Sequence, residues 1–311
     1  MKLVFCGTPQ FAVPSLEKLA GAGFQIQLVV TQPDRPQGRG MEMAAPPVKQ
    51  SAIKLALPVA QPESIRKNEE FQQKMKKLQP DAIIVVGYGR IVPPWMLQVP
   101  PHGNINVHAS LLPEYRGAAP IQWAIARGEN VTGVTTMRID EGLDTGDILL
   151  QRETAILPED TAVTLAPRLA ETGADLLIET LRGLEQGSIH PIPQENAHAT
   201  LAPILKREDG QIDFNRTAVE IHNRLRGFQP WPGAYTQFRG KNFKIIAARP
   251  SEPLPDLGPG ELRVVGEKLF TGCGAETTLE LLHVQPEGKT PMSAREFIMG
   301  YKPARHDLVA P

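Results

Sequence analysis

Short apolar runs alternate with amphipathic stretches along the first half of the chain. Short, continuous apolar runs are typical of strands buried on both faces, whereas apolar positions spaced three and four residues apart indicate helices. We expect strands over Leu3–Cys6, Ile26–Thr31, Ala82–Val86 and Ile105–Val107, and helices over Phe11–Ala22, Val48–Ala56 and Asn68–Leu78. Strands that alternate with helices predict an α/β fold with a doubly wound parallel sheet covered on both faces.

Two more strands are expected over Thr132–Arg138 and Ile148–Glu153, joined by a turn rich in Gly and Asp. The stretch Thr161–Leu184 has helical periodicity, but Pro167 lies within it. Because proline is tolerated in the first turn of a helix and disrupts its interior, this helix is expected either to start near Thr164 or to be kinked.

The pattern changes near residue 190. Residues 190–206 are rich in Pro, Ala and polar residues without a period, which predicts a linker. A helix is expected over Thr217–Arg226, followed by short strands over Ala234–Phe238, Phe243–Ala248, Leu262–Val265 and Thr278–Val284. Short strands punctuated by Gly and Pro predict a small antiparallel barrel or sandwich. Two domains are therefore expected, 1–189 and 207–311.

Composition narrows the class of protein. The 311 residues, 41% hydrophobic and 22% charged, suit two globular domains. The two cysteines, Cys6 and Cys273, are too far apart in sequence for a Cys-x-x-Cys motif and offer no disulfide framework, which suits a reducing cytoplasm. The first apolar run is too short for a secretory signal and no apolar window could span a membrane, so a cytoplasmic protein without a membrane partner is predicted.

Charge is unevenly distributed although the net charge is −1. Residues 1–100 carry 12 Lys and Arg against 7 Asp and Glu, and residues 201–250 carry 9 against 4. Residues 101–200 instead carry 6 against 14. The composition argues against a uniformly basic nucleic-acid-binding protein, but it allows basic patches on either side of an acidic centre.

Polar residues follow three of the expected strands, at Gly7–Pro9, Gly87–Arg90 and Asn106–Ser110. In a doubly wound sheet the ligand crevice lies at the carboxyl ends of the strands. Asn106 and His108 alternate along one strand and so share a face, where both could donate hydrogen bonds to an oxyanion. Spacing alone favours the simpler interpretation that they satisfy backbone groups at a sheet edge.

The acidic segment Ile139–Asp147 also has several interpretations. Its Asp and Gly residues are ordinary turn formers, and a calcium loop would need an order of carboxylates that is missing here. A carboxylate from this segment that meets His108 would hold its tautomer. No histidine pair has metal-ligand spacing, so no metal is expected, and neither a dinucleotide-binding glycine motif nor a phosphate-binding loop is present.

The loop Gln32–Gly40 contains two arginines, and basic residues are frequent over 201–250. A loop and scattered charges of this kind are common on a solvent-exposed surface, but their basic side chains could also contact phosphates.

The segments Asn106–Ile121 and Met137–Leu149 resemble the two signatures of the enzymes that move formyl groups from 10-formyltetrahydrofolate. The opening Gly7–Pro9, the loop Gln32–Gly40 and the segment Phe228–Ala234 narrow the resemblance to members that formylate methionine on initiator methionyl-tRNA. The resemblance covers essentially the whole chain.

This resemblance implies a Rossmann-like N-terminal domain, a C-terminal barrel related to the OB-fold that binds tRNA, and a monomer that needs no metal. Asn106, His108 and Asp144 match the family's catalytic trio, and Arg39 matches an arginine of a loop that enters the acceptor end of the tRNA. The folate-contacting segment is matched by Ser110, Leu111, Leu112 and Pro113.

The implied chemistry has a physical account. The methionine amino group attacks the formyl carbon on folate N10, and a negatively charged oxygen develops that Asn106 and His108 would stabilise. Asp144 would orient His108 and could help remove the proton of the amine.

Three alternatives stay open. One is transfer to another amine, on a nucleotide sugar or a purine precursor, with the same trio. Another is hydrolysis of the formyl folate. A third, of a different class, is a non-catalytic RNA-binding module with an OB-like barrel, which the intact Asn106, His108 and Asp144 argue against.

Overall fold

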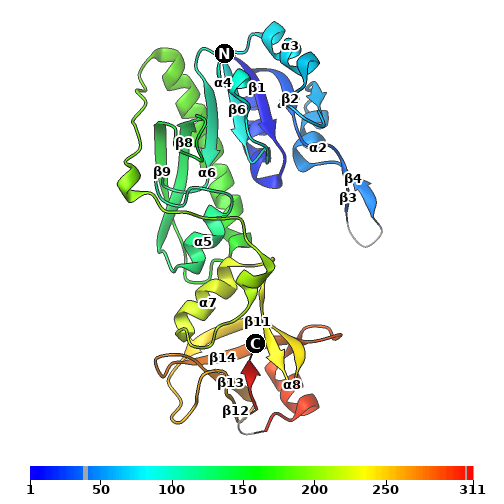
Figure 1. Cartoon of the computed structure of the whole chain (residues 1–311), viewed down its shortest axis with the longest axis vertical. Helices are drawn as coiled ribbons and strands as arrows, with labels where there is room; N and C mark the ends of the chain where they lie inside the picture. The colour runs from blue at the N-terminus through cyan, green and yellow to red at the C-terminus, as the bar shows by residue number, and fades with distance from the viewer. Residues whose placement is uncertain (38–40, 305–306, 311) are drawn as a thin grey trace. The chain divides into compact units, whose positions relative to one another are not determined.

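The computed structural model describes residues 1–37, 41–304 and 307–310. The chain forms two compact units (Figure 1). The first contains Met1–Pro120, Val131–Ala155 and Ala166–Ala202, and the second contains Ile121–Asn130, Ile156–Leu165 and Pro203–Pro311. The second unit therefore includes two segments from the first half of the chain in addition to its C-terminal part.

The first unit is built on a 7-stranded sheet in the order β5-β2-β1-β6-β7-β8-β9. Strands β5, β2, β1, β6 and β7 are parallel, and β8 and β9 each run antiparallel to the preceding strand. These strands are β1 (Lys2–Gly7), β2 (Gln25–Val30), β5 (Val59–Ala60), β6 (Ala82–Val86), β7 (Asn104–His108), β8 (Val131–Arg138) and β9 (Ile148–Ala155). The expected α/β class and parallel sheet are confirmed, with an antiparallel pair added at one edge.

Helices cover both faces of this sheet. Their bounds are α1 (Val13–Gly21), α2 (Pro47–Lys54), α3 (Glu69–Leu78), α4 (Pro94–Leu97) and α6 (Ala162–Gln186). One face packs Phe71 and Met75 of α3 against alternate residues of β1, β2 and β6. The strands in the middle are continuous apolar runs because both of their faces are buried.

On the other face, α6 approaches β7 and β8 closely. A Cβ atom at Gly173 would lie 2.8 Å from Val107 Cγ1 and 3.2 Å from Val134 Cγ1, so only glycine allows this approach. Helix α6 begins at Ala162, two residues before Thr164, and Pro167 lies in its second turn. The Thr161 carbonyl accepts from the N–H groups of Thr164 and Leu165, which closes the first turn ahead of the proline.

A short hairpin, β3 (Arg35–Gln37) with β4 (Glu42–Ala44), extends from the first unit (Figure 1). Its base is fixed by Asp34, which pairs with Lys49 at 2.7 Å and accepts a hydrogen bond from Gln61 at 2.7 Å. The hydrogen bond from Gln61 and the charge of Lys49 hold the pKa of the Asp34 carboxyl below its usual range.

The segment 190–206, predicted as a linker, is attached to the first unit over most of its length. Ile192 forms an antiparallel bridge with Ile148, and the Ala202 N–H donates to the Arg116 carbonyl at 2.8 Å. We call residues 190–202 the strap. Its apparent lack of pattern arises because it pairs with distant residues instead of forming an element of its own.

The second unit contains a 7-stranded antiparallel sheet, with β15 paired to β14 beside the path β12-β13-β14-β11-β10-β16. Its strands are β10 (Ala234–Phe238), β11 (Lys241–Ser251), β12 (Leu262–Val265), β13 (Lys268–Gly272), β14 (Thr278–Pro286), β15 (Met292–Ser293) and β16 (Val309–Ala310). The helices are α7 (Ala218–Gly227) and α8 (Ala294–Tyr301), with α5 (Pro120–Ala126) at the start of one of its segments.

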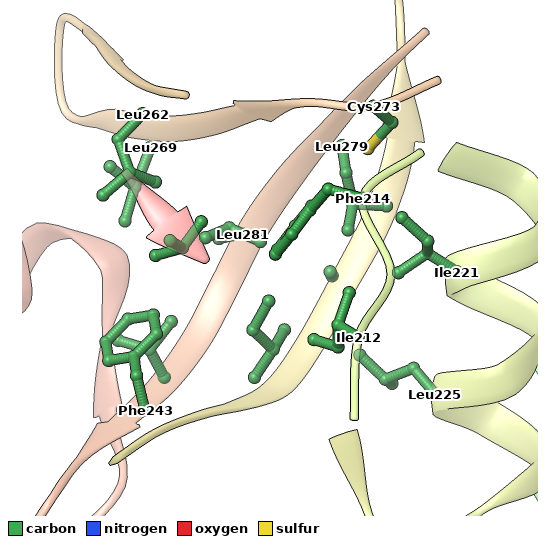
Figure 2. Packing of buried hydrophobic residues seen from close by; sticks show 14 of the residues in the cluster. Ile212, Phe214, Ile221, Leu225, Phe243, Leu262, Leu269, Cys273, Leu279 and Leu281 are labelled. Atoms are coloured by element: carbon green, nitrogen blue, oxygen red, sulfur yellow. The ribbon is translucent and has the colours of Figure 1, made fainter. Parts of the chain in front are cut away.

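The core of the second unit lies between this sheet and its helices. Figure 2 shows Ile221 and Leu225 of α7 beside Ile212 and Phe214, with Leu281 of β14 among the neighbouring core residues. Phe297 of α8 is fully buried, although neither α8 nor β13 was expected from the sequence. The predicted antiparallel sheet is confirmed. No described helix is long and apolar enough to cross a membrane.

Candidate active site

The strand order reverses at β1, whose two neighbours in the sheet are β2 and β6. A ligand crevice is expected at the carboxyl ends of the strands on either side of this point. Two of the predicted strand-end segments meet there, because Thr8 Oγ1 donates to the Tyr88 carbonyl at 3.1 Å. Gln32 Nε2, at the end of β2, donates to the same carbonyl at 3.1 Å. The loops after β1, β2 and β6 are thus tied together.

Asn106 and His108 lie on β7, which is the neighbour of β6 in the sheet and lies two positions from β1, where the strand order reverses. Strand β7 pairs with β6 on one side and β8 on the other, so it is an interior strand and not a sheet edge. The residue between them, Val107, is 4% exposed and faces α6, so Asn106 and His108 point to the opposite face. The Asn106 side chain makes no hydrogen bond to any residue that the structure describes.

His108 is buried, with a protein acceptor near each ring nitrogen. Nε2 donates to the Tyr115 carbonyl at 2.9 Å, and since a carbonyl only accepts, Nε2 carries a proton. Nδ1 lies 3.7 Å from Asp144 Oδ2. A doubly protonated ring would therefore have an acceptor at one nitrogen and a carboxylate beside the other.

Asp144 reaches His108 from the loop between β8 and β9. Its backbone is left-handed, with φ 52°, and its Oδ2 accepts from the Gly117 N–H at 2.8 Å. Asp140 of the same loop is a turn former, because its Oδ1 accepts from the Gly142 N–H and from the Thr145 hydroxyl. Among the described residues no group of three His, Cys, Asp or Glu could hold a metal ion.

The segment Ser110–Pro113 leaves the end of β7 as a closely held loop. Thr135 on β8 holds two of its residues: the Thr135 hydroxyl donates to the Ser110 carbonyl at 2.6 Å and accepts from the Leu112 N–H at 3.1 Å. Gln151 Nε2 donates to the Leu112 carbonyl at 2.8 Å. The Ser110 hydroxyl is buried and donates to the Glu114 carbonyl at 2.6 Å, so it shapes the loop from within.

The structure thus brings together His108 and Asp144 and places Asn106 on the same face of β7 as His108. Arg39 lies outside the described residues. Sequence reasoning missed the Tyr115 carbonyl and the Gly117 N–H, which are backbone groups and leave no signature in residue type. It also missed Gln194, which lies in the segment predicted as a linker and donates to the Asp144 carbonyl at 2.8 Å.

Comparisons with known proteins identify the family of the chain. The formyl transferase family model matches residues 1–181, and the model of the formyl transferase C-terminal domain matches residues 204–302. A curated protein named methionyl-tRNA formyltransferase, from Koribacter versatilis, is 66% identical over 99% of this chain and 98% of its own. A second protein of that name, from Acidobacterium capsulatum, is 59% identical over 96% of both chains.

Solved structures show the same fold at low identity. The N-formyltransferase of Helicobacter canadensis, solved in complex with folinic acid and dTDP-3-aminofucose, is similar with a TM-score of 0.68 at 21% identity. The similarity covers 92% of this chain and 99% of that one. The chain therefore belongs to the formyl transferase family, together with the proteins named methionyl-tRNA formyltransferase that match it over nearly its full length.

Proposed function

We propose that this protein transfers the formyl group of 10-formyltetrahydrofolate to the amino group of methionine on initiator methionyl-tRNA, for translation initiation. The observation that carries the assignment is the 66% identity, over 99% of the chain, to a protein named for that reaction. Both units take part in the match, which a catalytic domain attached to an unrelated module would not produce.

For the reaction itself, Asn106, His108 and Asp144 are the proposed catalytic residues. The amine nitrogen bonds to the formyl carbon, the carbonyl oxygen becomes negatively charged, and the bond between the formyl carbon and folate N10 then breaks. Asn106 is the side chain best placed to donate to that oxygen, because its amide is not engaged by the described residues. One such donor is typically worth about 2.7–4 kcal/mol in the transition state.

His108 and Asp144 act as a pair in this proposal. A protonated His108 brings positive charge beside the developing oxyanion, while Asp144 lies 3.7 Å from its Nδ1 and keeps the ring in place. The amine loses one proton as it attacks and N10 gains one as it leaves, and Asp144 is the nearby carboxylate that can accept the first. Since the attacking amine must be neutral, activity falls at low pH.

The folate contacts are proposed to come from Ser110, Leu111, Leu112 and Pro113. Their loop is anchored by Thr135 and Gln151 rather than by a ligand, so its shape is set in advance. Because the Ser110 hydroxyl donates within the loop, this residue contributes by shaping the loop. Preorganisation of this kind reduces the entropy that a ligand must lose on binding.

The C-terminal domain, residues 207–311, is proposed to be an OB-like barrel that binds the tRNA. Closure of the sheet is supported by a bridge between Glu261, beside β12, and Leu308, beside β16, which stand at the two ends of the strand order. The Leu262 N–H donates to the Asp307 carbonyl and the Val309 N–H to the Gly260 carbonyl, both at 2.8 Å. These bonds pair the two ends with each other, as a barrel requires.

Many basic residues of 201–250 are engaged within the protein. Arg226 is buried and donates to the Asp160 carbonyl, while Arg216, Arg239 and Arg249 each contact carboxylates. A better phosphate-binding candidate is the patch of Arg207, Tyr235 and Lys244. Lys244 is opposite Tyr235 in the β10–β11 pair, and the Arg207 guanidinium lies 6.0 Å from the Tyr235 ring centroid.

The reaction is placed in the cytoplasm, because its acceptor is a tRNA used in protein synthesis. A monomer is sufficient, since Asn106, His108 and Asp144 all come from one chain.

The function is tested by one assay: transfer of labelled formyl from 10-formyltetrahydrofolate to methionyl initiator tRNA. Elongator methionyl-tRNA, free methionine and an amino-sugar nucleotide serve as parallel acceptors, and a reaction without acceptor measures hydrolysis. We expect rapid transfer to the initiator tRNA and little to the others. Preferential transfer to the sugar amine, or release of formate without acceptor, would overturn the assignment.

A further inference from the structure

The strap holds together the two loops that surround His108. One loop, residues 109–119, supplies the Tyr115 carbonyl to Nε2, and the other, residues 139–147, supplies the Asp144 carboxylate beside Nδ1. The strap runs along both loops. It is paired with Ile148, directly after the second loop, through Ile192, and with Arg116 of the first loop through Ala202.

Gln194 of the strap uses both ends of its amide. Its Nε2 donates to the Asp144 carbonyl at 2.8 Å and to the Gly146 carbonyl at 2.7 Å. Its Oε1 accepts from Arg116 Nε at 3.1 Å and from Arg116 Nη2 at 2.7 Å. One side chain therefore bridges the backbone that carries Asp144 and a residue one position from Tyr115.

Arg116 is a firm anchor for this bridge. It is 7% exposed, and Nη2 makes a further hydrogen bond to Asn196 Oδ1 at 2.9 Å. Its backbone N–H donates to the Thr200 carbonyl at 2.9 Å. Within the described part of the chain its guanidinium is held by amide side chains and contacts no carboxylate, so its charge is not spent on an ion pair.

From these contacts we infer that Gln194 is a positioning residue for the formyl transfer: it holds the Asp144 loop against the Tyr115–Gly117 loop and thereby sets the distance between Asp144 and His108. The inference rests on the proposed function of Asn106, His108 and Asp144. Gln194 touches none of the reacting atoms in this role. It acts through Asp144, whose left-handed backbone needs tertiary support to persist.

The chemistry of the contacts requires an amide. A glutamate at this position would accept from Arg116 and gain an ion pair, but it would place a carboxylate against the carbonyls of Asp144 and Gly146, which only accept. Gln194→Glu therefore keeps the attachment to Arg116 and removes the hold on the Asp144 loop. Gln194→Ala removes both.

The test compares Gln194→Glu, Gln194→Ala and the control Glu195→Ala, an exposed neighbour on the strap, in the formyl-transfer assay. We expect kcat to fall about 10- to 100-fold in both Gln194 variants, the cost of a misplaced catalytic group, with KM for folate and tRNA within about twofold of the parent. Glu195→Ala should keep the parental values. Unchanged kcat, a change confined to KM, or full rescue by Gln194→Glu would overturn the inference.

A second measurement separates positioning from general damage. If Gln194 acts through Asp144, adding Gln194→Ala to Asp144→Asn should lower kcat little further, whereas independent effects would multiply. Hydrogen exchange gives a readout without turnover: the Gly117 N–H, which donates to Asp144, should exchange faster in both Gln194 variants. Equal protection in parent and variants would contradict the inference. An inactive parent protein would instead contradict the proposed function.

Discussion

His108 Nδ1 and Asp144 Oδ2 lie 3.7 Å apart, although His108 ends strand β7 and Asp144 comes from the loop between β8 and β9. The other ring nitrogen donates to the Tyr115 carbonyl at 2.9 Å. Protein groups therefore lie beside both ring nitrogens, whereas the Asn106 amide, on the same face of β7, makes no hydrogen bond within the described residues.

Replacing His108 with alanine should lower kcat by about 10²- to 10³-fold, since it removes the charge proposed to stabilise the oxyanion. The melting temperature should change little, because both hydrogen-bonding loops are also held by the strap. Steady-state kinetics and thermal unfolding check this. Near-native turnover by a folded variant would show that the reaction does not use His108.

Asn106→Ala should lower kcat by a similar factor of about 10²–10³ while leaving the affinity for formyl folate nearly unchanged. The amide is expected to matter only when negative charge develops on the formyl oxygen. Asn106→Asp should be at least as inactive, because a carboxylate cannot donate and repels the oxyanion. Fluorescence titration with a folate analogue separates binding from turnover, and a loss confined to binding would refute this role.

Gly117→Ala should destabilise the first unit by about 3 kcal/mol. Gly117 has φ 122°, and an added Cβ would lie 2.6 Å from the Ala202 carbonyl oxygen of the strap. Gly187→Ala is the matched control, because Gly187 also has a left-handed φ of 69° but no heavy atom within 4 Å of the added Cβ. Gly187→Ala should lower the free energy of unfolding by about 1–2 kcal/mol. Equal losses of unfolding free energy in the two variants, measured by urea denaturation, would mean that the strap can shift to accommodate the added Cβ without a further loss of stability.

Asp34 should titrate below its ordinary value of 3.8, because its pKa is lowered first by the Gln61 hydrogen bond and then by Lys49. A carboxyl with a lowered folded-state pKa stabilises the fold above the unfolded pKa and loses that contribution as the pH falls through the folded pKa. Gln61→Leu should raise the Asp34 titration midpoint, measured by carbon-13 NMR of the carboxyl. Gln72→Leu on α3 is the control, and the same midpoint in both variants would contradict the assigned cause.

Arg39→Ala should raise KM for charged tRNA and leave folate binding almost unchanged, since Arg39 is proposed to contact the acceptor end. The slope of log binding constant against log salt should become shallower by about 1, as expected for one lost phosphate contact. Arg182→Ala removes the same charge elsewhere and should leave the slope unaltered. A loss of folate binding as large as the loss of tRNA binding in Arg39→Ala would contradict the assignment of this residue to the tRNA contact.

Local sequence patterns predicted much of the fold. Ala82–Val86 is a strand with the predicted bounds, because a continuous apolar run suits the middle of a parallel sheet. The helix predicted from Asn68 begins directly after it, with Asn68 Oδ1 accepting from the Phe71 N–H as an N-cap. These features depend on neighbouring residues and so can be recognised in the sequence.

The unpredicted parts depend on distant residues. The strap has no period of its own and acquires structure by pairing Ile192 with Ile148 and Ala202 with Arg116. Asn106 and His108 could be placed on one face from strand periodicity alone. The approach of Asp144 could not, because it requires a left-handed turn and a hydrogen bond from Gly117, 27 residues away in sequence.

Gly173 on α6 limits how the strand that carries Asn106 and His108 can be positioned. Asn106 and His108 flank Val107, and Val107 rests against α6 where a Cβ at Gly173 would lie 2.8 Å away. Any larger side chain at this helix position would push on β7 from behind and shift both polar residues together. The positions of Asn106 and His108 therefore depend on a buried glycine on the opposite face of the sheet.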